Sequence, residues 1–94
     1  MNIMLSDNDK QAILDILVEQ IGVQRAQLTP AAKIEEDLGA DSLTKIEIGM
    51  ALEERFHLSI PDEQLERVST VDDLLATMAR LLATPDREAA GTVK

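Results

Sequence analysis

Residues 41–57 read DSLTKIEIGMALEERFH, and this stretch decides the fold. Apolar side chains recur in it at the spacing of an α-helix, which predicts a helix ending at about His57. Ile48, Leu52 and Phe56 fall on one side of that helix and form the stripe that normally faces a core. Either Asp41 or Ser42 can cap its N-terminus, because both side chains accept hydrogen bonds from free backbone N–H groups.

The same helix carries a second apolar stripe, roughly opposite the first and interleaved with acids. Its apolar members are Leu43, Ile46 and Met50, and the interleaved acids are Glu47, Glu53 and Glu54. One interpretation is a helix buried on both sides, but buried carboxylates without partners are costly. An apolar strip flanked by acids is more typical of a docking surface, and we favour that interpretation.

Three further helices are predicted, one before this helix and two after it. Ser6 opens a capping box before the first helix, and Gly22 ends it. Residues 23–40 form a long loop, whose apolar side chains we expect to pin it to the core: Leu28, Ile34 and Leu38. A short third helix begins near Pro61. A fourth begins at a capping-box-like pair, Thr70 and Asp73, and ends near Ala83.

These elements predict an all-α protein. We expect a small four-helix bundle, with three main helices, a short third helix and the long loop between the first and second. The predicted domain covers residues 1–83, and residues 84–94, which have no periodicity, are predicted to be a disordered tail.

The composition excludes several classes of function. The 94 residues include 18 acids, 9 Lys plus Arg and no Cys, for a net charge of -9. Nucleic acids and anionic membranes attract basic surfaces, so neither is an expected partner. Without Cys there is no disulfide or thiolate metal site. No apolar run is long enough to span a bilayer, and residues 1–10 do not look like a signal peptide. We expect a cytoplasmic monomer.

The negative charge is concentrated around the predicted docking helix. Residues 33–73 hold 12 acids and 4 bases, and so account for -8 of the total charge of -9. A docking partner is therefore expected to be basic.

Ser42 allows three interpretations. Taken alone, a Ser at this position is most often an N-cap. A nucleophilic Ser needs a base within reach, and the only His, His57, would lie roughly 22 Å away along a continuous helix. A catalytic role, and with it an enzyme, is therefore not expected. The third interpretation is a covalently modified Ser, because a phosphate here would face the free N–H groups of a helix N-terminus.

The motif around Ser42 resembles the acyl carrier protein family. The matching residues are DLGADSL at 37–43, followed by Ile46, Glu47, residues 50–54, Phe56, residues 60–62 and residues 69–71. The resemblance covers about residues 5–83. It implies that Ser42 carries 4′-phosphopantetheine added by a phosphopantetheinyl transferase, and that Asp41 and Leu43 belong to the cofactor-binding site. Acyl groups would be carried as thioesters on the terminal thiol.

The resemblance also implies partners and an acyl pocket. Acyltransferases, ketosynthases and other acyl-using enzymes with basic patches would contact Leu43, Ile46, Glu47, Met50, Glu53 and Glu54. Acyl chains would be sequestered between the second and third helices, in a pocket lined by Ile48, Leu52, Phe56, Ile60 and Leu65.

Two positions depart from the family pattern. Many relatives carry an acid where this chain has Thr44, and Lys45 follows it, so the charge near Ser42 is less negative. Gly49 replaces a bulkier aliphatic residue at a cost of about 1 kcal/mol relative to Ala. Gly49 indicates either close backbone packing, which we favour, or extra room beside the acyl pocket.

Three alternatives stand beside this interpretation, and the second of them keeps the fold and changes only the cargo. Glu54 and His57 match the Glu-x-x-His pattern of di-metal bundles, but those sites need a second copy and further Glu residues, so no metal is expected. An aminoacyl or peptidyl carrier would use the same modified Ser. A helical interaction module without modification would use Ser42 only as a cap.

Overall fold

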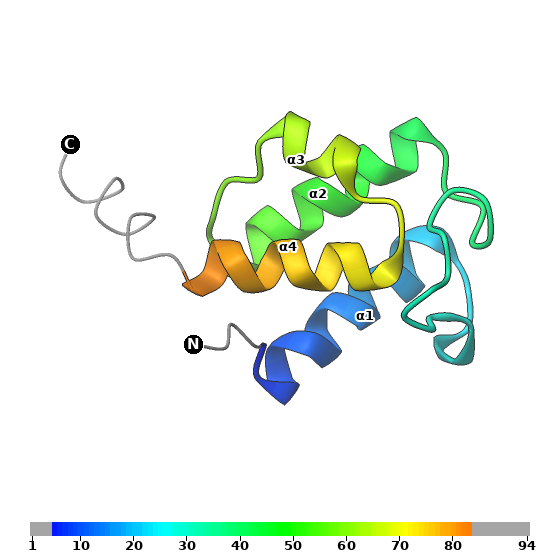
Figure 1. Cartoon of the computed structure of the whole chain (residues 1–94), viewed down its shortest axis with the longest axis horizontal. Coiled ribbons are helices and arrows are strands. Elements are labelled where there is room, and N and C mark those ends of the chain that lie inside the picture. The colour runs from blue at the N-terminus through cyan, green and yellow to red at the C-terminus, as the bar shows by residue number, and fades with distance from the viewer. Residues whose placement is uncertain (1–4, 84–94) are drawn as a thin grey trace, which may run out of the picture.

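The computed structural model describes residues 5–83, and this part of the chain is an all-α bundle, as predicted (Figure 1). Its elements are α1 (Asp7–Ile21), the 3-10 turn η1 (Arg25–Gln27), α2 (Ser42–Phe56), α3 (Asp62–Arg67) and α4 (Val71–Ala83). The long loop connects α1 to α2, and α3 is the short helix. The predicted tail, residues 84–94, lies outside the described residues. None of the described helices has the length and apolar character needed to cross a bilayer.

The predicted caps of α1 are confirmed. The Ser6 hydroxyl accepts a hydrogen bond of 3.1 Å from the Asp9 backbone N–H. Gly22 ends the helix with a φ of 85°, and its N–H donates to the Val18 carbonyl. Glycine is suited to this left-handed conformation because it has no β-carbon.

The N-cap of α2 is Asp41, and Ser42 is the first helical residue. The Asp41 carboxylate accepts a 2.9 Å hydrogen bond from the Thr44 N–H. The interpretation of Ser42 as the cap is therefore wrong, because the preceding residue already fills that role. At the other end, His57 adopts a left-handed conformation with a φ of 57° and donates its N–H to the Glu53 carbonyl.

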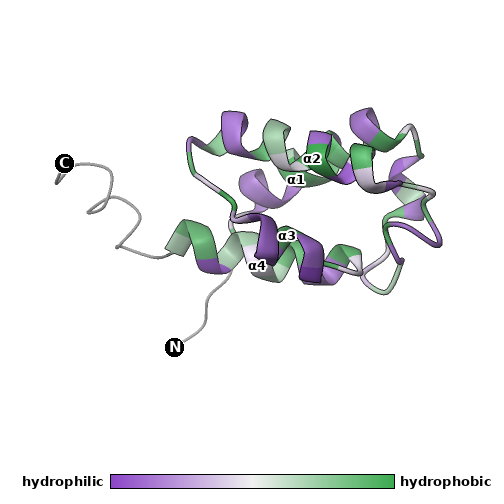
Figure 2. Ribbon diagram, turned by 90° about the horizontal axis from the view of Figure 1, so that it is seen from above, coloured by the Kyte–Doolittle hydropathy of each residue, from purple (hydrophilic) through white to green (hydrophobic). Residues whose placement is uncertain are grey.

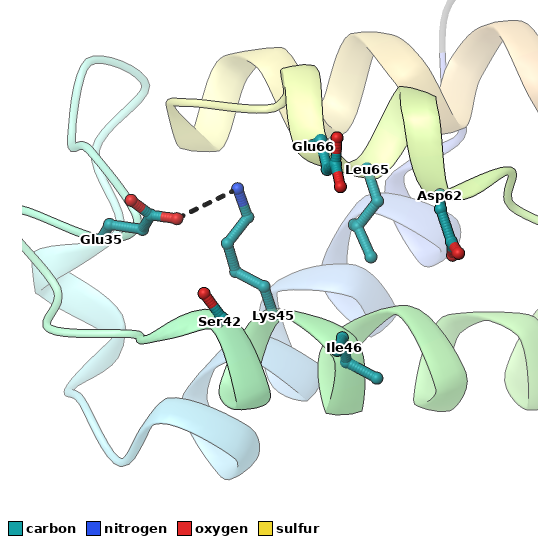
Figure 3. Close-up of a pocket in the computed structure, with 7 residues that line it drawn as sticks. All are labelled: Glu35, Ser42, Lys45, Ile46, Asp62, Leu65 and Glu66. Carbon is teal, nitrogen blue, oxygen red and sulfur yellow. Dashed lines mark ion pairs between the residues drawn. The ribbon is translucent and has the colours of Figure 1, made fainter.

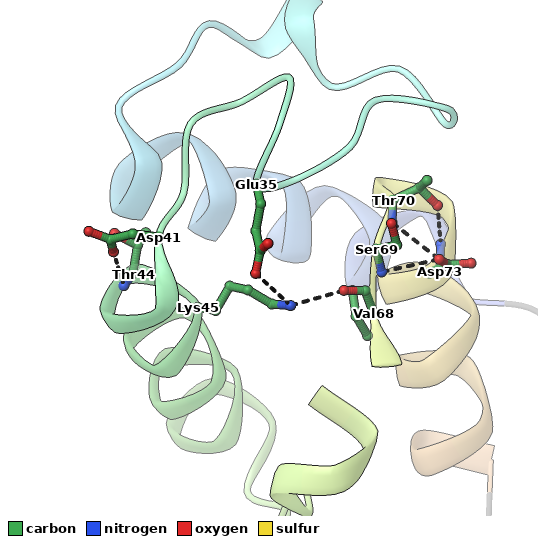
Figure 4. A network of polar contacts seen from close by, with 8 residues as sticks. All are labelled: Glu35, Asp41, Thr44, Lys45, Val68, Ser69, Thr70 and Asp73. Carbon is green, nitrogen blue, oxygen red and sulfur yellow. Dashed lines mark hydrogen bonds and ion pairs between the residues drawn. The ribbon is translucent and has the colours of Figure 1, made fainter. Parts of the chain in front are cut away.

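A reciprocal pair of hydrogen bonds begins α4, as the sequence predicts (Figure 4). The Asp73 N–H donates to the Thr70 hydroxyl over 3.0 Å, and the Thr70 N–H donates to the Asp73 carboxylate over 3.2 Å. The Ser69 N–H donates to the same carboxylate over 3.1 Å. These bonds use backbone donors that the helix itself cannot pair.

The core lies where the apolar stripes of α1, α2 and α4 meet, and Figure 2 shows the apolar residues along the helices. Its largest fully buried members include Ile13, Leu17, Ile48, Leu52, Leu74 and Met78. Leu28, Ile34 and Leu38 are buried against this core, which confirms that they pin the long loop.

The long loop also pairs with the segment before α4, which the sequence did not predict. Lys33 forms an antiparallel bridge with Thr70. The Ile34 N–H donates to the Ser69 carbonyl over 2.8 Å, and the Val71 N–H donates to the Ala32 carbonyl over 2.9 Å. This pairing ties the loop that leads to Ser42 to the rest of the bundle.

Candidate functional site

Ser42 is exposed at the first residue of α2. Within residues 5–83, no group makes a hydrogen bond with its hydroxyl. The neighbouring Leu43 side chain is 62% exposed. The hydroxyl is therefore accessible to a modifying enzyme, and the backbone N–H groups at the start of α2 favour an anion attached to it.

Asp41 fixes the backbone on which Ser42 is presented. The backbone N–H of Thr44 and then the Thr44 hydroxyl, each 2.9 Å from the carboxylate, lower the pKa of Asp41 from its ordinary value of 3.8. These hydrogen bonds stabilise the charged form, so the carboxylate stays ionised at neutral pH. The Asp41 carboxylate therefore faces Thr44 and stabilises the first turn of α2.

A cavity of about 480 Å³ opens beside Ser42, between α2 and α3 (Figure 3). Its lining combines apolar and charged side chains: Glu35, Ser42, Lys45, Ile46, Asp62, Leu65 and Glu66. Lys45 is the one basic side chain in this lining. A long, flexible group attached to Ser42 would have this space immediately next to it.

Lys45 is paired within the bundle. Its ammonium donates to the Val68 carbonyl over 3.0 Å and lies 3.4 Å from the Glu35 carboxylate (Figure 4). The Lys45 side chain is only 12% exposed. Its charge is therefore directed toward the long loop and the end of α3, which limits how much it offsets the acids of the exposed face.

The exposed face of α2 carries the predicted apolar strip. Leu43, Ile46 and Met50 are 62%, 53% and 62% exposed. Glu47 and Glu54 are also exposed, and these five residues form the strip that is predicted to bind partners, which we term the docking strip. The interpretation of α2 as buried on both sides is wrong, because only the opposite stripe faces the core.

Glu53 differs from the other two acids of this helix. Its carboxylate accepts a 2.6 Å hydrogen bond from the Ile60 N–H and is only partly exposed. Glu53 thus connects α2 to the segment leading into α3. A shallow depression of about 530 Å³ beside the docking strip includes Glu53 together with Gln20 of α1.

The residues predicted to line an acyl pocket lie together in the bundle. Ile48, Leu52 and Ile60 are buried, whereas Phe56 and Leu65 are half-buried against the same core. A void of about 10 Å³ beside them is lined by Ile34, Lys45, Ile48, Leu65, Val68 and Leu74. Of the predicted set, Ile48 and Leu65 line this void.

Gly49 is buried on α2 directly opposite Leu65 of α3. The Leu65 side chain fills the space that a larger residue would occupy at position 49. This contact supports close packing as the reason for Gly49, and no extra room is present beside it.

Near the end of α2, the Arg55 guanidinium lies 5.2 Å from the centre of the Phe56 ring, a cation–π contact.

The described part of the chain contains no cluster of side chains that would support the alternative of a metal site. Within residues 5–83, no group of three or more His, Asp or Glu side chains is placed to hold a metal ion. His57 serves instead as the C-cap of α2.

Comparison with known proteins defines the class of this site. A family model described as a phosphopantetheine attachment site matches residues 11–78. The match spans most of the bundle, including Ser42 and the whole of α2. The fold and site therefore define a phosphopantetheine-bearing carrier domain, and 4′-phosphopantetheine is its cofactor.

Three curated relatives are each named acyl carrier protein. The relative from Syntrophobacter fumaroxidans is 47% identical over 68 residues, which cover 72% of this chain and 84% of the relative. The Akkermansia muciniphila protein is 41% identical over 78 residues, or 82% and 98% of the two chains. The Helicobacter pylori protein is 50% identical over 60 residues, or 64% and 77%. The chain belongs to the acyl carrier protein family.

Membership of this family establishes the general role. The chain is a carrier of acyl groups and not an enzyme. It is a substrate for a phosphopantetheinyl transferase and interacts with acyl-handling enzymes. The residues at the site suit the cofactor, because the Ser42 hydroxyl is free and the adjoining cavity of about 480 Å³ is lined by both apolar and polar side chains.

Proposed function

We propose that Ser42 is the attachment point for 4′-phosphopantetheine and that residues 1–83 form the carrier domain. The observation that carries this proposal is the free, exposed Ser42 hydroxyl at the start of α2, beside the cavity between α2 and α3. The hydroxyl oxygen would form the phosphodiester bond. Asp41 holds the helix start in place, and the N–H groups of the first turn favour the phosphodiester anion.

The attached group supplies the reactive thiol that this chain lacks, since the sequence contains no Cys. The protein's own contribution is to present the arm on a rigid helix N-terminus while leaving it free to move. The cavity next to Ser42 gives the arm and a short acyl group a place against the protein surface.

Partner enzymes would bind the docking strip. Leu43, Ile46 and Met50 supply apolar area to bury, and Glu47 and Glu54 attract basic residues around it. The expected partners are the phosphopantetheinyl transferase and acyltransferases, ketosynthases or other acyl-using enzymes with basic patches. The partly exposed Glu53 would contribute mainly by holding the helix end. We expect the protein to act as a cytoplasmic monomer.

Intact mass spectrometry tests the attachment point. The chain is incubated with coenzyme A and a phosphopantetheinyl transferase of broad specificity, and a mass gain of one phosphopantetheine is expected. Ser42→Ala should abolish the gain, whereas the control Ser59→Ala, at another exposed Ser, should keep it. No gain in the wild-type chain, or a gain that survives Ser42→Ala, would refute the proposal.

The cargo is tested separately on protein purified from its native host. The mass of the group on Ser42 distinguishes an acyl thioester from an aminoacyl or peptidyl thioester. An acyl group is expected, because the curated relatives are named acyl carrier proteins. An amino acid on the arm would contradict the proposed cargo while leaving the attachment point intact.

A further inference from the structure

Lys45 spans the space between the long loop, α2 and the end of α3. Its ammonium donates to the Val68 carbonyl over 3.0 Å, and Glu35 lies 3.4 Å from it (Figure 4). In Figure 3 the Lys45 side chain rises from α2 toward α3, beside Ser42. Ser42 and Lys45 are three positions apart on α2 and so share a face of the helix.

The Lys45 side chain lies between two spaces of different character. It lines the outer cavity of about 480 Å³ that opens at Ser42. It also lines the space of about 10 Å³, here called the inner void because its other residues are all apolar and, apart from the half-buried Leu65, buried. A lysine stem commonly covers apolar surface while its ammonium finds a polar partner, and both conditions are met here.

From this position we propose that Lys45 is the gate between the outer cavity and the apolar interior, and so determines which acyl chains are sequestered there. The inference rests on the proposed attachment at Ser42. A short acyl chain fits in the outer cavity and leaves Lys45 in place. A longer chain reaches the interior only by displacing the Lys45 stem, which breaks the hydrogen bond to Val68.

The packing of the interior supports a gate that must move. A void of about 10 Å³ holds no more than a single water molecule, so an acyl chain must make its own space. Leu65 and Lys45 are the two side chains that line both spaces, and neither is fully buried. Ile34, Ile48 and Leu74 are fully enclosed and resist displacement.

The two partners of the Lys45 ammonium differ in exposure, which suits an inward and an outward position of the Lys45 side chain. Val68 is buried, so its carbonyl can be reached only when Lys45 lies inward. Glu35 is exposed on the loop and can keep its ion pair if the ammonium swings outward. Opening therefore costs the hydrogen bond to Val68 while the charge remains paired in solvent.

The test compares holo protein loaded with butanoyl or octanoyl groups, after mass spectrometry has confirmed loading on Ser42. Sequestration is measured as the rate at which hydroxylamine cleaves the thioester. The variant Lys45→Met keeps an apolar stem of similar length and removes the ammonium. The control Lys33→Met removes an exposed lysine whose ion-pair partner, Glu36, lies at 3.5 Å and which does not line the inner void.

In Lys45→Met the octanoyl thioester should be cleaved about tenfold more slowly than in the wild type, because opening no longer breaks a hydrogen bond from a charged group. The butanoyl thioester should show no change, and Lys33→Met should behave as the wild type with both. Equal octanoyl rates for wild type and Lys45→Met would overturn the gate. Failure of Ser42 to load would instead refute the proposed function.

A second measurement needs no variant. Nuclear magnetic resonance of the lysine ammonium groups should show Lys45 hydrogen-bonded in the unloaded holo protein and in the butanoyl form. In the octanoyl form the protection of this ammonium from solvent exchange should be lost. Retention of the protected Lys45 signal with an octanoyl group would also contradict the proposal.

Discussion

Leu65 of α3 packs against Gly49 of α2 so closely that a β-carbon on Gly49 would lie 2.9 Å from Leu65 Cδ2. A glycine inside a helix costs about 1 kcal/mol relative to alanine, so helix propensity favours any residue here other than glycine or proline. The close approach of α3 gives a reason for the glycine. Position 49 thereby influences how tightly the short helix, which borders the cavity at Ser42, lies on α2.

Gly49→Val should lower the free energy of unfolding by about 1–3 kcal/mol, because its added carbons overlap the Leu65 side chain and force that side chain to repack. Urea denaturation of the apo protein measures the effect. The double variant with Leu65→Ala is the control, since it removes the side chain that is met first. In that background Gly49→Val should cost much less, and an unchanged cost would show that the overlap is not the cause.

Asp41→Ala should destabilise the apo protein more than Ser42→Ala does. Asp41 accepts the capping hydrogen bond from Thr44, whereas the Ser42 hydroxyl has no such partner in the described chain. Thermal unfolding should show Tm lowered by about 5 °C for Asp41→Ala and by about 2 °C or less for Ser42→Ala. The reverse order would mean that Ser42 is the true cap.

The helix boundaries were predictable because they depend on local chemistry. Ser6, Gly22 and Thr70 act on backbone groups within a few residues, so the sequence alone indicates their roles. At α2, two adjacent residues could each serve as the cap. Local sequence could not decide between Asp41 and Ser42, because the choice depends on where the chain turns into the helix.

Contacts between distant segments could not be predicted in the same way. The pairing of Lys33 with Thr70 uses backbone groups, which carry no side-chain signature. Helical periodicity places Lys45 on a face of α2, but its partners come from the loop and α3. Glu53 fits the acidic pattern of Glu47 and Glu54, and only the return of the chain at Ile60 distinguishes it.

Acid should weaken the N-terminal cap of α4. The backbone N–H of Thr70, followed by that of Ser69, lowers the pKa of Asp73 below its ordinary value of 3.8. The folded protein therefore binds this proton more weakly than the unfolded chain does. The stability that Asp73 contributes is complete above the unfolded pKa, and it is lost as pH falls through the lower folded pKa.

Asp73→Asn isolates this contribution, because the amide does not titrate in this range. Wild type should be more stable than Asp73→Asn near neutral pH, and the difference should shrink as pH falls below about 4. Asp72→Asn is the control, since it removes the same charge one residue earlier, where no described group donates a hydrogen bond to the carboxylate. If the difference in stability between wild type and Asp73→Asn stayed constant from neutral pH to pH 3, the proposed role of the ionised Asp73 carboxylate would be contradicted. Guanidinium denaturation at each pH provides the measurement.

Charge reversal on the docking strip should slow the modification of Ser42. Glu47 and Glu54 are exposed beside the apolar strip, where they would attract a basic partner. The double variant Glu47→Lys and Glu54→Lys should lower kcat/KM of the phosphopantetheinyl transferase about tenfold at low salt, mainly through KM. The loss should shrink as salt is added, because exposed charges are screened.

Glu19→Lys on α1 tests whether the transferase responds to charge at the docking strip or to the net charge of the protein. Glu19 is exposed and lies outside the docking strip, so its reversal should change kcat/KM little. Met50→Ala, which removes apolar area within the strip, should lower kcat/KM by a factor that does not depend on salt. If Glu19→Lys reduced modification as much per charge as the two reversals on α2, the partner would be responding to net charge. The docking strip would then have no special role.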